Sequence, residues 1–270
     1  MNKWAADSLK ARESALVLVP LVKHYDRDVA SGGKTVEIPN ISNLTANAKV
    51  ANTQVTLNAP TETKTTITLN QHFEASILIE DILDWQSAYD LASEYTEKTG
   101  FAIAEKMDNF VATTMTSGVS AGNTLGTYGT ALTYAVVRAG KLALDRAKAP
   151  ITDRQLVVSP KGHDDLLGVA EFTRYDAMGA SGDANSIKNG KVGYILGFPV
   201  YMSQNLVITA GTPEQNNNLM FQKEAFAIAI QKEVKFEKQR KTEYLGDLYV
   251  SQALYGGSVL RQDHIALLKS

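Results

Sequence analysis

The chain has 270 residues, of which 44% are hydrophobic and 21% are charged, as in an ordinary soluble globular protein. The formal net charge of −2 leaves no basic surplus for specific DNA recognition. The sequence contains no cysteine, which excludes disulfides and thiolate metal sites. Its N-terminus lacks the apolar core of a signal peptide, and the apolar run from Ala15 to Val22 is too short to span a bilayer. We therefore expect a soluble, cytoplasmic protein without a membrane partner.

Residues 1–33 form a distinct first piece, in which apolar residues are mixed with charged ones and which ends in Ala30-Ser31-Gly32-Gly33. We interpret this piece as an N-terminal arm that contains a short helix. It packs either on a neighbouring subunit or on its own domain, and the sequence leaves both open.

A second arm follows. Residues 34–41 alternate apolar and polar side chains, which predicts a short strand that Pro39 ends. Residues 42–65 are then almost all polar or small, yet they are rich in threonine and carry little charge, which favours strands over disorder. We expect a protruding two-stranded arm that turns near Ala59-Pro60, although a flexible surface loop is an alternative.

An isolated hairpin is marginally stable in water, so this arm is expected to lie on another subunit. Its apolar residues are too sparse to anchor it to a core: Val50, Val55 and Leu57. The candidate intersubunit contacts are its polar residues: Asn52, Gln54, Thr56, Asn58, Thr63 and Lys64.

The next stretch predicts one very long strand that runs directly into one very long helix. Apolar residues occupy most odd positions of this stretch, which is the period of a half-buried strand: Ile67, Leu69, Phe73, Ala75, Ile77 and Ile79. From Asp81 the period changes to three or four, with Asp81 as N-cap and Gly118 as the stop. The residues of the buried helix face are then Ile82, Trp85, Tyr89, Ala92, Thr96, Thr99, Ile103, Met107, Phe110 and Thr114. Elements of this length suggest an elongated subunit that completes its burial against neighbours.

Residues 117–129 are rich in glycine, serine and threonine, which predicts a mobile connector at the boundary between structural regions. Helices and strands alternate after it. The first expected element is a helix over 130–148 with Leu132, Val136, Ala139 and Leu142 on one face. A buried strand over 155–158 follows, and then a helix that Ser159 caps and that has Pro160 at its first position. Further along we expect an exposed loop over 171–190, a strand over 193–201 and a polar loop over 209–218. Long strands return over 225–237, and a last strand pair covers 248–255 and 258–268 around Gly256-Gly257.

No pattern of catalytic or metal-binding residues is present. The four histidines do not pair at metal-ligand spacing, and no glycine-rich run matches a phosphate-binding motif. Ser159, His163 and Asp164 lie too close together for a catalytic triad, whose members normally converge from separate loops. A hydrolase that uses Ser159 or His163 is therefore a remote alternative, and we expect neither an enzyme nor a cofactor.

The order of these parts resembles the major capsid proteins of tailed bacteriophages, which share the Hong Kong 97 fold with encapsulin shells. Residues 33–39 are similar to the start of that family's extended loop, and residues 73–81 are similar to the return strand that runs into its spine helix. Residues 154–160 and 193–206 resemble strand-then-helix segments of the axial domain, and residues 255–261 resemble the closing segment.

The resemblance implies an α+β fold with five parts: an N-terminal arm (1–33), an extended β-hairpin loop (34–80), a spine helix with its connector (81–129), an axial domain (130–222) and the returning strands of the peripheral domain (223–270). Because only about 33 residues precede Lys34, we expect no fused scaffolding domain in this chain.

The function it implies is self-assembly into hexamers and pentamers of an icosahedral head, formed in the host cytoplasm, around non-specifically bound double-stranded DNA. Separate scaffolding, portal and decoration proteins are further implied partners. An encapsulin-type compartment and a tail-tube or other ring-forming phage protein are the alternatives.

Overall fold

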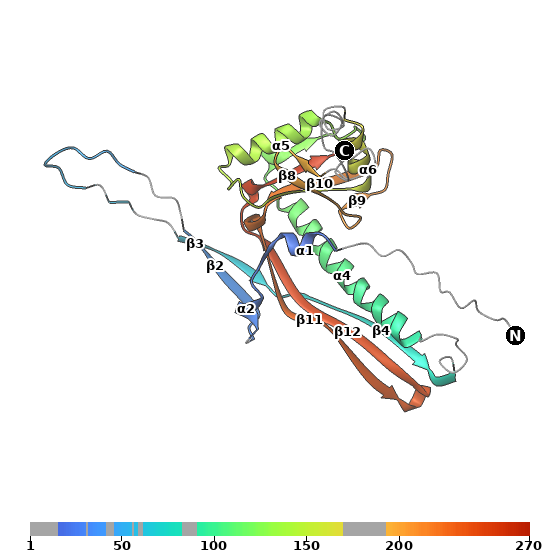
Figure 1. Ribbon diagram of the computed structural model, residues 1–270. Helices are drawn as coiled ribbons and strands as arrows, with labels where there is room; N and C mark the ends of the chain where they lie inside the picture. Colours follow the sequence, from blue (N-terminus) through green and yellow to red (C-terminus); the bar gives the residue numbers. More distant parts are fainter. Residues whose placement is uncertain are drawn as a thin grey trace, which may run out of the picture.

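The computed structural model describes residues 16–30, 32–41, 46–55, 57–58, 62–82, 91–169 and 193–270. It shows an elongated subunit with three parts: a compact body, a long sheet with a helix along it, and a thin arm (Figure 1). The α-helices are α1 (Leu18–Leu21), α2 (Asp26–Val29), α4 (Leu91–Ser117), α5 (Tyr134–Arg146) and α6 (Pro160–Leu167). The strands are β1 (Lys23–His24), β2 (Thr35–Ile41), β3 (Glu62–Thr68), β4 (Gln71–Glu80), β5 (Thr124–Gly126), β6 (Arg154–Val158), β7 (Tyr194–Ile195), β8 (Phe198–Met202), β9 (Ile208–Thr209), β10 (Gln215–Gln222), β11 (Phe226–Lys241), β12 (Gly246–Val259) and β13 (Ile265–Lys269).

The long sheet has the strand order β1-β11-β12-β4. β11 and β12 form an antiparallel hairpin of 16 and 14 residues, and β4 pairs with β12 over all ten of its residues. The predicted return of the chain to long strands is therefore confirmed. The predicted turn at Gly256-Gly257 is wrong, because both glycines lie inside β12, and β13 belongs to the other large sheet.

Crowding explains the glycine at position 256. A Cβ atom placed there would lie 2.2 Å from the carbonyl oxygen of Thr68, the last residue of β3. At position 257 the ring of Phe226 occupies the same kind of space, at 2.7 Å. Gly256 and Gly257 thus lie where other parts of the chain approach β12 closely, which is a common reason for glycine inside a strand.

Helix α4 lies along one face of the long sheet (Figure 1) and is about 40 Å long at ~1.5 Å per residue. Ile103 and Met107 are buried against Ala253 and Tyr255 of β12, as their spacing predicts. The hydroxyls of Thr99 and Ser251 approach to 2.9 Å between the same two elements. Trp85 and Tyr89 fall outside the described residues, so the predicted burial of these two side chains is untested. Ile82, predicted on the same buried face, is 62% exposed, so that prediction is wrong.

The helix ends at Ser117, as predicted, and Gly118 follows it. The N–H of Gly118 donates to the carbonyl oxygens of Thr114 and Met115, while a Cβ at this position would lie 2.6 Å from a methyl carbon of Val259. Glycine therefore allows β12 to pass close to the end of α4.

The single long strand expected over residues 66–80 is divided into β3 and β4, which belong to different sheets. The alternation persists across the break, because Ile67, Leu69 and Ile79 are all buried. The predicted N-cap at Asp81 is also incorrect. Asp81 already has helical structure, and its carboxylate binds Arg240 of β11.

The compact body is built on a seven-stranded sheet of order β5-β13-β10-β6-β8-β7, with β9 paired to β10. Alternate residues of its central strands face opposite sides. Leu156, Val158 and Leu268 pack under α5 and α6, whereas Val157 and Leu267 pack with the C-terminal end of α4 and with α1. Burial on both faces explains why these strands are continuous apolar runs.

Helix α5 exists as predicted but begins at Tyr134, and its buried face is Val137, Gly140 and Leu144. The face predicted from Val136, Ala139 and Leu142 is therefore rotated, and Leu142 is 48% exposed. Gly140 allows this face of α5 to pack closely on the sheet, because a Cβ at that position would already lie 3.0 Å from the side chain of Leu268.

Three predicted loops and strands of the body are revised. The connector over 117–129 contains β5, which pairs with β13 and is therefore part of the sheet. The strand expected over 193–201 is a tight hairpin of β7 and β8, which turns at Leu196-Gly197, both with positive φ. The polar loop expected over 209–218 is confined to residues 210–214, because residue 209 belongs to β9 and residues 215–218 belong to β10. The loop expected over 171–190 lies outside the described residues.

The described part of the N-terminal piece packs on its own subunit, which is one of the two alternatives that the sequence leaves open. Leu18 and Val22 are fully buried in the core that joins α4 to the compact body. Asp108 of α4, itself fully buried, accepts hydrogen bonds from the N–H groups of Val17, Leu18 and Val19 at 2.8–3.2 Å. It also accepts a bond from the side-chain amide of Asn205 in the body, at 3.2 Å.

Candidate functional site

The arm consists of β2, β3 and the segment between them, whose described residues 46–55 and 57–58 are all exposed. β2 and β3 pair only with each other, from Thr35 opposite Thr68 to Ile41 opposite Glu62. Beyond this pairing the chain leaves the body (Figure 1). Pro39 lies within β2 and does not end it, because an edge strand needs no N–H donor on its open side.

The arm reverses direction at Val50–Thr53. The N–H and the hydroxyl of Thr53 both donate to the carbonyl oxygen of Val50, and Asn52 has a φ of 60°. The side chains of Asn47 and Asn58 are joined by a 3.0 Å hydrogen bond across the two limbs. The turn predicted near Ala59-Pro60 is thus misplaced, since the register of β2 and β3 places the reversal near residue 52.

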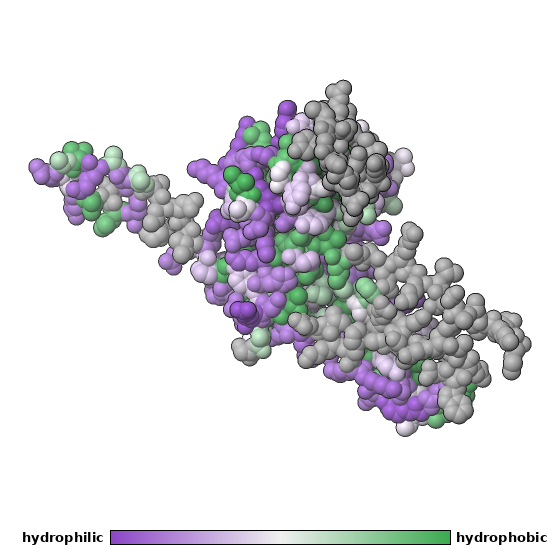
Figure 2. All heavy atoms as spheres, viewed as in Figure 1, coloured by the Kyte–Doolittle hydropathy of each residue, from purple (hydrophilic) through white to green (hydrophobic). Residues whose placement is uncertain are grey.

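Large apolar side chains are exposed near the tip of the arm. Val50 is 68% exposed, Val55 57% and Leu57 84%. Figure 2 shows apolar residues among polar ones at this end of the molecule. None of these side chains can reach the core of its own subunit, so the arm presents apolar surface that only another molecule can bury.

The candidate contact residues lie on the same arm. Those that the structure describes are exposed: Asn52, Gln54, Asn58, Thr63 and Lys64. Thr56 falls outside the described residues. Lys64 forms a 2.7 Å ion pair with Glu37 across the strands, and the Thr63 hydroxyl donates to the carbonyl of Asn40 at 3.4 Å. The sequence analysis did not include the exposed Val50, Val55 and Leu57 among the candidate contacts, although three aliphatic residues in a segment without a core were a signal for them.

The distal end of the long sheet forms a second exposed surface. Arg240 of β11 donates to both carboxylate oxygens of Asp81, at 2.5 and 2.6 Å, and Lys238 binds Asp247 of β12 at 2.8 Å. The hydrogen bond from Arg240 lowers the pKa of Asp81, and the hydrogen bond from Lys238 lowers the pKa of Asp247. The same end exposes three large apolar residues: Ile82, Tyr244 and Leu245.

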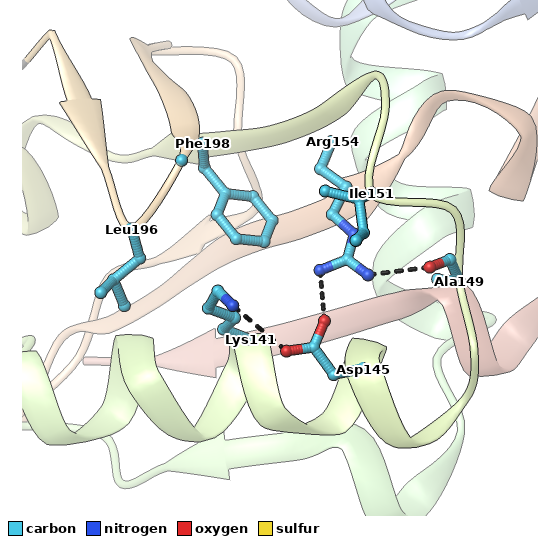
Figure 3. Close-up of a pocket in the computed structure, with 8 residues that line it drawn as sticks. Lys141, Asp145, Ala149, Ile151, Arg154, Leu196 and Phe198 are labelled. Carbon is cyan, nitrogen blue, oxygen red and sulfur yellow. Dashed lines mark hydrogen bonds and ion pairs between the residues drawn. The ribbon is translucent and has the colours of Figure 1, made fainter.

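An open cavity of about 400 Å³ lies between α5 and the β7–β8 hairpin (Figure 3). Arg154 lies in its wall with its side chain only 4% exposed, and it donates to Asp145 at 2.6 Å and to the Ala149 carbonyl at 2.8 Å. The hydrogen bond from Arg154 lowers the pKa of Asp145. Each of the three side-chain nitrogens of Arg154 donates one hydrogen bond to a protein oxygen, so this side chain acts as a brace between α5 and β6.

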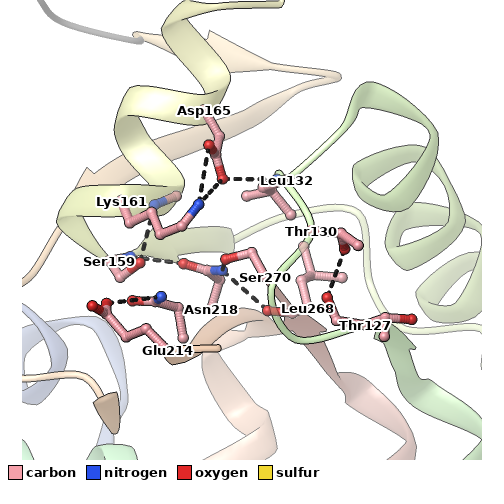
Figure 4. Close-up of polar contacts among 12 residues, drawn as sticks. Thr127, Thr130, Leu132, Ser159, Lys161, Asp165, Glu214, Asn218, Leu268 and Ser270 are labelled. Atoms are coloured by element: carbon pink, nitrogen blue, oxygen red, sulfur yellow. Dashed lines mark hydrogen bonds and ion pairs between the residues drawn. The ribbon is translucent and has the colours of Figure 1, made fainter. Parts of the chain in front are cut away.

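A network around Asn218 connects the body's sheet to α6 (Figure 4). Asn218 accepts from the N–H of Ser159 at 2.7 Å and donates to the Leu268 carbonyl at 3.1 Å. Ser159 is fully buried, and its hydroxyl oxygen caps α6 by accepting from the N–H of Gly162 at 3.0 Å, as predicted. Such a hydroxyl is unavailable to a substrate.

Other kinds of site do not appear within the described residues. No cluster of three or more histidine, aspartate or glutamate side chains could hold a metal ion there. Across the same part of the chain, no helix combines the length and apolar character that crossing a lipid bilayer requires.

Elongated shape, exposed arm and paired long strands together define a structural subunit of the viral-shell class. The profile of the family described as "Phage capsid protein" matches residues 22–264. The chain belongs to this family, and the predicted capsid protein and capsid fold are confirmed.

Solved capsid structures have the same fold. The chain is similar to a protein of Mycobacterium phage Che8, with a TM-score of 0.84 and 24% identity over 99% of this chain and 96% of that one. It is also similar to the capsid of cyanophage P-SCSP1u (TM-score 0.78, 21% identity, 99% and 92% covered) and to the capsid of Ralstonia phage GP4 (0.75, 13%, 100% and 94%). A sequence search of curated proteins finds no significant match.

Proposed function

We propose that copies of this chain assemble through hexamers and pentamers into an icosahedral phage head that encloses double-stranded DNA, and that each subunit lays its arm over a neighbour. The observation that carries this proposal is the arm, which exposes Val50, Val55 and Leu57 where its own body cannot cover them. Its polar residues Asn52, Gln54, Thr56, Asn58, Thr63 and Lys64 would complete the contact.

The five-part division of the chain at residues 33, 80, 129 and 222 belongs to the same proposal. In it, the seven-stranded body is the axial domain and the long sheet with α4 is the peripheral domain. The placement of β5 in the body's sheet supports an earlier start for the axial domain, near residue 120.

The proposed head forms in the host cytoplasm. Its inner face meets DNA without sequence specificity, which agrees with a chain whose net charge is −2. Scaffolding, portal and decoration proteins would be separate chains. A catalytic role is not part of the proposal, because Ser159 is buried as a helix cap, and replacing His163 by alanine should leave assembly unchanged.

Deleting the arm tests this function. Replacing residues 44–60 by a short Gly/Ser turn keeps the whole β2–β3 pairing from Ile41 and Glu62 back to the body. We expect a folded subunit with unchanged circular dichroism that sediments as small species and forms no closed particles. Closed particles of normal size would refute the role of the arm.

Nucleic acid content separates the alternatives. Particles from infected cells that contain nuclease-protected DNA support a phage head, whereas particles with protein cargo and no DNA would indicate an encapsulin-type compartment. Filaments or open tubes would indicate the tail-tube alternative, which the capsid fold disfavours.

A further inference from the structure

Strand β11 contains a bulge close to the base of the arm. Ile230 pairs with Tyr255 and Lys232 pairs with Leu254, so Gln231 is an extra residue without a partner on β12. A bulge leaves local polar groups unpaired and turns a side chain in a new direction. Here the segment that leads into the arm binds both the unpaired N–H of Ile230 and the redirected side chain of Gln231.

The segment that precedes β2 contacts β11 in three ways, two of them at the bulge. β1 pairs with β11 in parallel, with Lys23 opposite Ala227. Asp26, at the start of α2, accepts a hydrogen bond from the N–H of Ile230 at 2.7 Å. Gln231 donates its side-chain amide to the carbonyl oxygens of Val29 and Gly33, each at 3.2 Å.

These contacts lie immediately before β2. The carbonyl of Lys34 accepts from the N–H of Leu69 at 2.9 Å, and β2 starts at the next residue, Thr35. Gly32 and Gly33 have φ values of 108° and 117°, which residues with side chains rarely adopt. The chain therefore turns sharply between α2 and β2, and Gln231 holds both sides of this turn. Figure 1 shows α2 beside the base of β2.

Apolar packing also anchors the base of the arm. Ile67 and Leu69 pack with Val29, Ala227 and Ala229, and the carbonyl of Thr68 sits against Gly256. Val36 and Ile38 of β2 pack against the same apolar cluster. Both strands of the arm therefore share this apolar anchor, and the turn that leads into β2 is held in addition by the polar contacts of Asp26 and Gln231.

We infer that Asp26 and Gln231 are positioning residues that set the direction in which the arm leaves the body, and thereby determine whether subunits close into a shell. This inference rests on the proposed function of the arm. Both side chains act at a distance from the exposed tip, and neither belongs to the apolar core.

The direction of the arm can be measured in unassembled subunits. Because the chain has no cysteine, Gln54→Cys at the tip and Lys98→Cys on α4 provide a unique pair of spin labels. The variants are Asp26→Ala and Gln231→Ala. Asp26→Asn keeps an acceptor oxygen and serves as the conservative rescue, and Gln239→Ala, an exposed glutamine of the same strand, is the matched control.

We expect both alanine variants to keep the circular dichroism of the parent, to broaden and shift the distribution of label distances, and, without labels, to lose closed particles. Asp26→Asn and Gln239→Ala should retain the parent distribution and particles. An unchanged distance distribution in both alanine variants would overturn the inference, whatever happens to assembly.

A broadened distribution with normal particles would overturn the link between arm direction and closure, while leaving the two residues as anchors. The proposed function fails by a different result, namely normal particles from the variant without residues 44–60. The two failures can therefore be told apart.

Discussion

Arg240 donates hydrogen bonds to both carboxylate oxygens of Asp81, at 2.5 and 2.6 Å, and so links the residue that follows β4 to strand β11. β4 and β11 are not neighbours in the sheet, because β12 lies between them. The ion pair therefore reaches across the distal end of the sheet, where Asp247 of β12 lies 3.4 Å from the same guanidinium.

This pair should make the acid stability of the subunit depend on Asp81. The pKa of Asp81 in the folded chain is lowered below its ordinary value of 3.8, so the stabilisation is present above pH 3.8 and is lost as the pH falls through the lowered value. We expect Asp81→Asn to reduce the difference in unfolding free energy between pH 7 and pH 3, measured by urea titration of unassembled subunits. Glu243→Gln, an exposed acid of the same hairpin, is the control. An equal pH dependence in parent and Asp81→Asn chains would contradict this prediction.

The apolar tip of the arm should matter for assembly and not for folding. Exchanging Val55 and Leu57 for serine changes only exposed surface, so the free energy of unfolding of the isolated subunit should stay within about 0.5 kcal/mol of the parent value. The yield of closed particles in a sucrose gradient should fall sharply. Ile151→Ser is the matched control, since Ile151 is also 84% exposed but lies on the body. Equal particle yields from both variants would show that the tip is not a contact.

Replacing Asp108 by alanine should destabilise the subunit strongly. The substitution leaves the N–H groups of Val17, Leu18 and Val19 and the amide of Asn205 without their acceptor. Buried donors without a partner cost about 1–3 kcal/mol each when water cannot replace the lost bond, so we expect a loss of roughly 3 kcal/mol or more in urea denaturation. Glu105→Ala, on the exposed side of the same helix, should change stability little. A loss below about 1 kcal/mol would mean that water satisfies these groups.

Gly256→Ala tests the close approach of β12 and β3. The new methyl group would lie 2.2 Å from a backbone oxygen of Thr68, which cannot move aside as a flexible side chain could. We expect a loss of about 2 kcal/mol or more in the free energy of unfolding, because overpacking of this kind displaces backbone. Gly122→Ala is the control, since nothing lies within 4 Å of a Cβ placed there. Similar melting temperatures for the two variants would refute the crowding argument.

Periodicity predicted the long elements of the fold well, because a half-buried strand and a half-buried helix repeat their contacts over many residues. The alternation from Ile67 to Ile79 and the buried face through Ile103 and Met107 are examples. The break between β3 and β4 was not predictable in this way. Both strands continue the same alternation, and only their different partners separate them.

Glycine and asparagine misled the sequence analysis for a physical reason. Gly256 and Gly257 indicate a turn by composition, but they are small because neighbouring chains crowd them. Asn216 to Asn218 read as a polar loop, yet they form a buried part of β10. The side-chain amide of Asn217 donates to the carbonyl of Val207, and that of Asn218 donates to the carbonyl of Leu268, 50 residues away along the chain. No local sequence pattern predicts these partners.

The candidate contact surface on the arm was predictable only in part. Its polar, β-prone composition placed the arm correctly, because a segment without a core must leave the body. The position of the turn depends on the register between Thr35 and Thr68, and the anchoring of the arm depends on a bulge in β11. Both are set by pairing between distant residues.

The base of the arm, the root of this projection, contacts strands β11 and β12, which are synthesised much later than the arm itself. Residues 227–231 and 256 hold this root, and they leave the ribosome roughly 10–40 seconds after the arm itself at ~5–20 residues per second. The nascent chain therefore carries an arm whose base does not yet have its contacts with β11 and β12. We therefore expect the arm to take its final direction only after strands β11 and β12 have been synthesised.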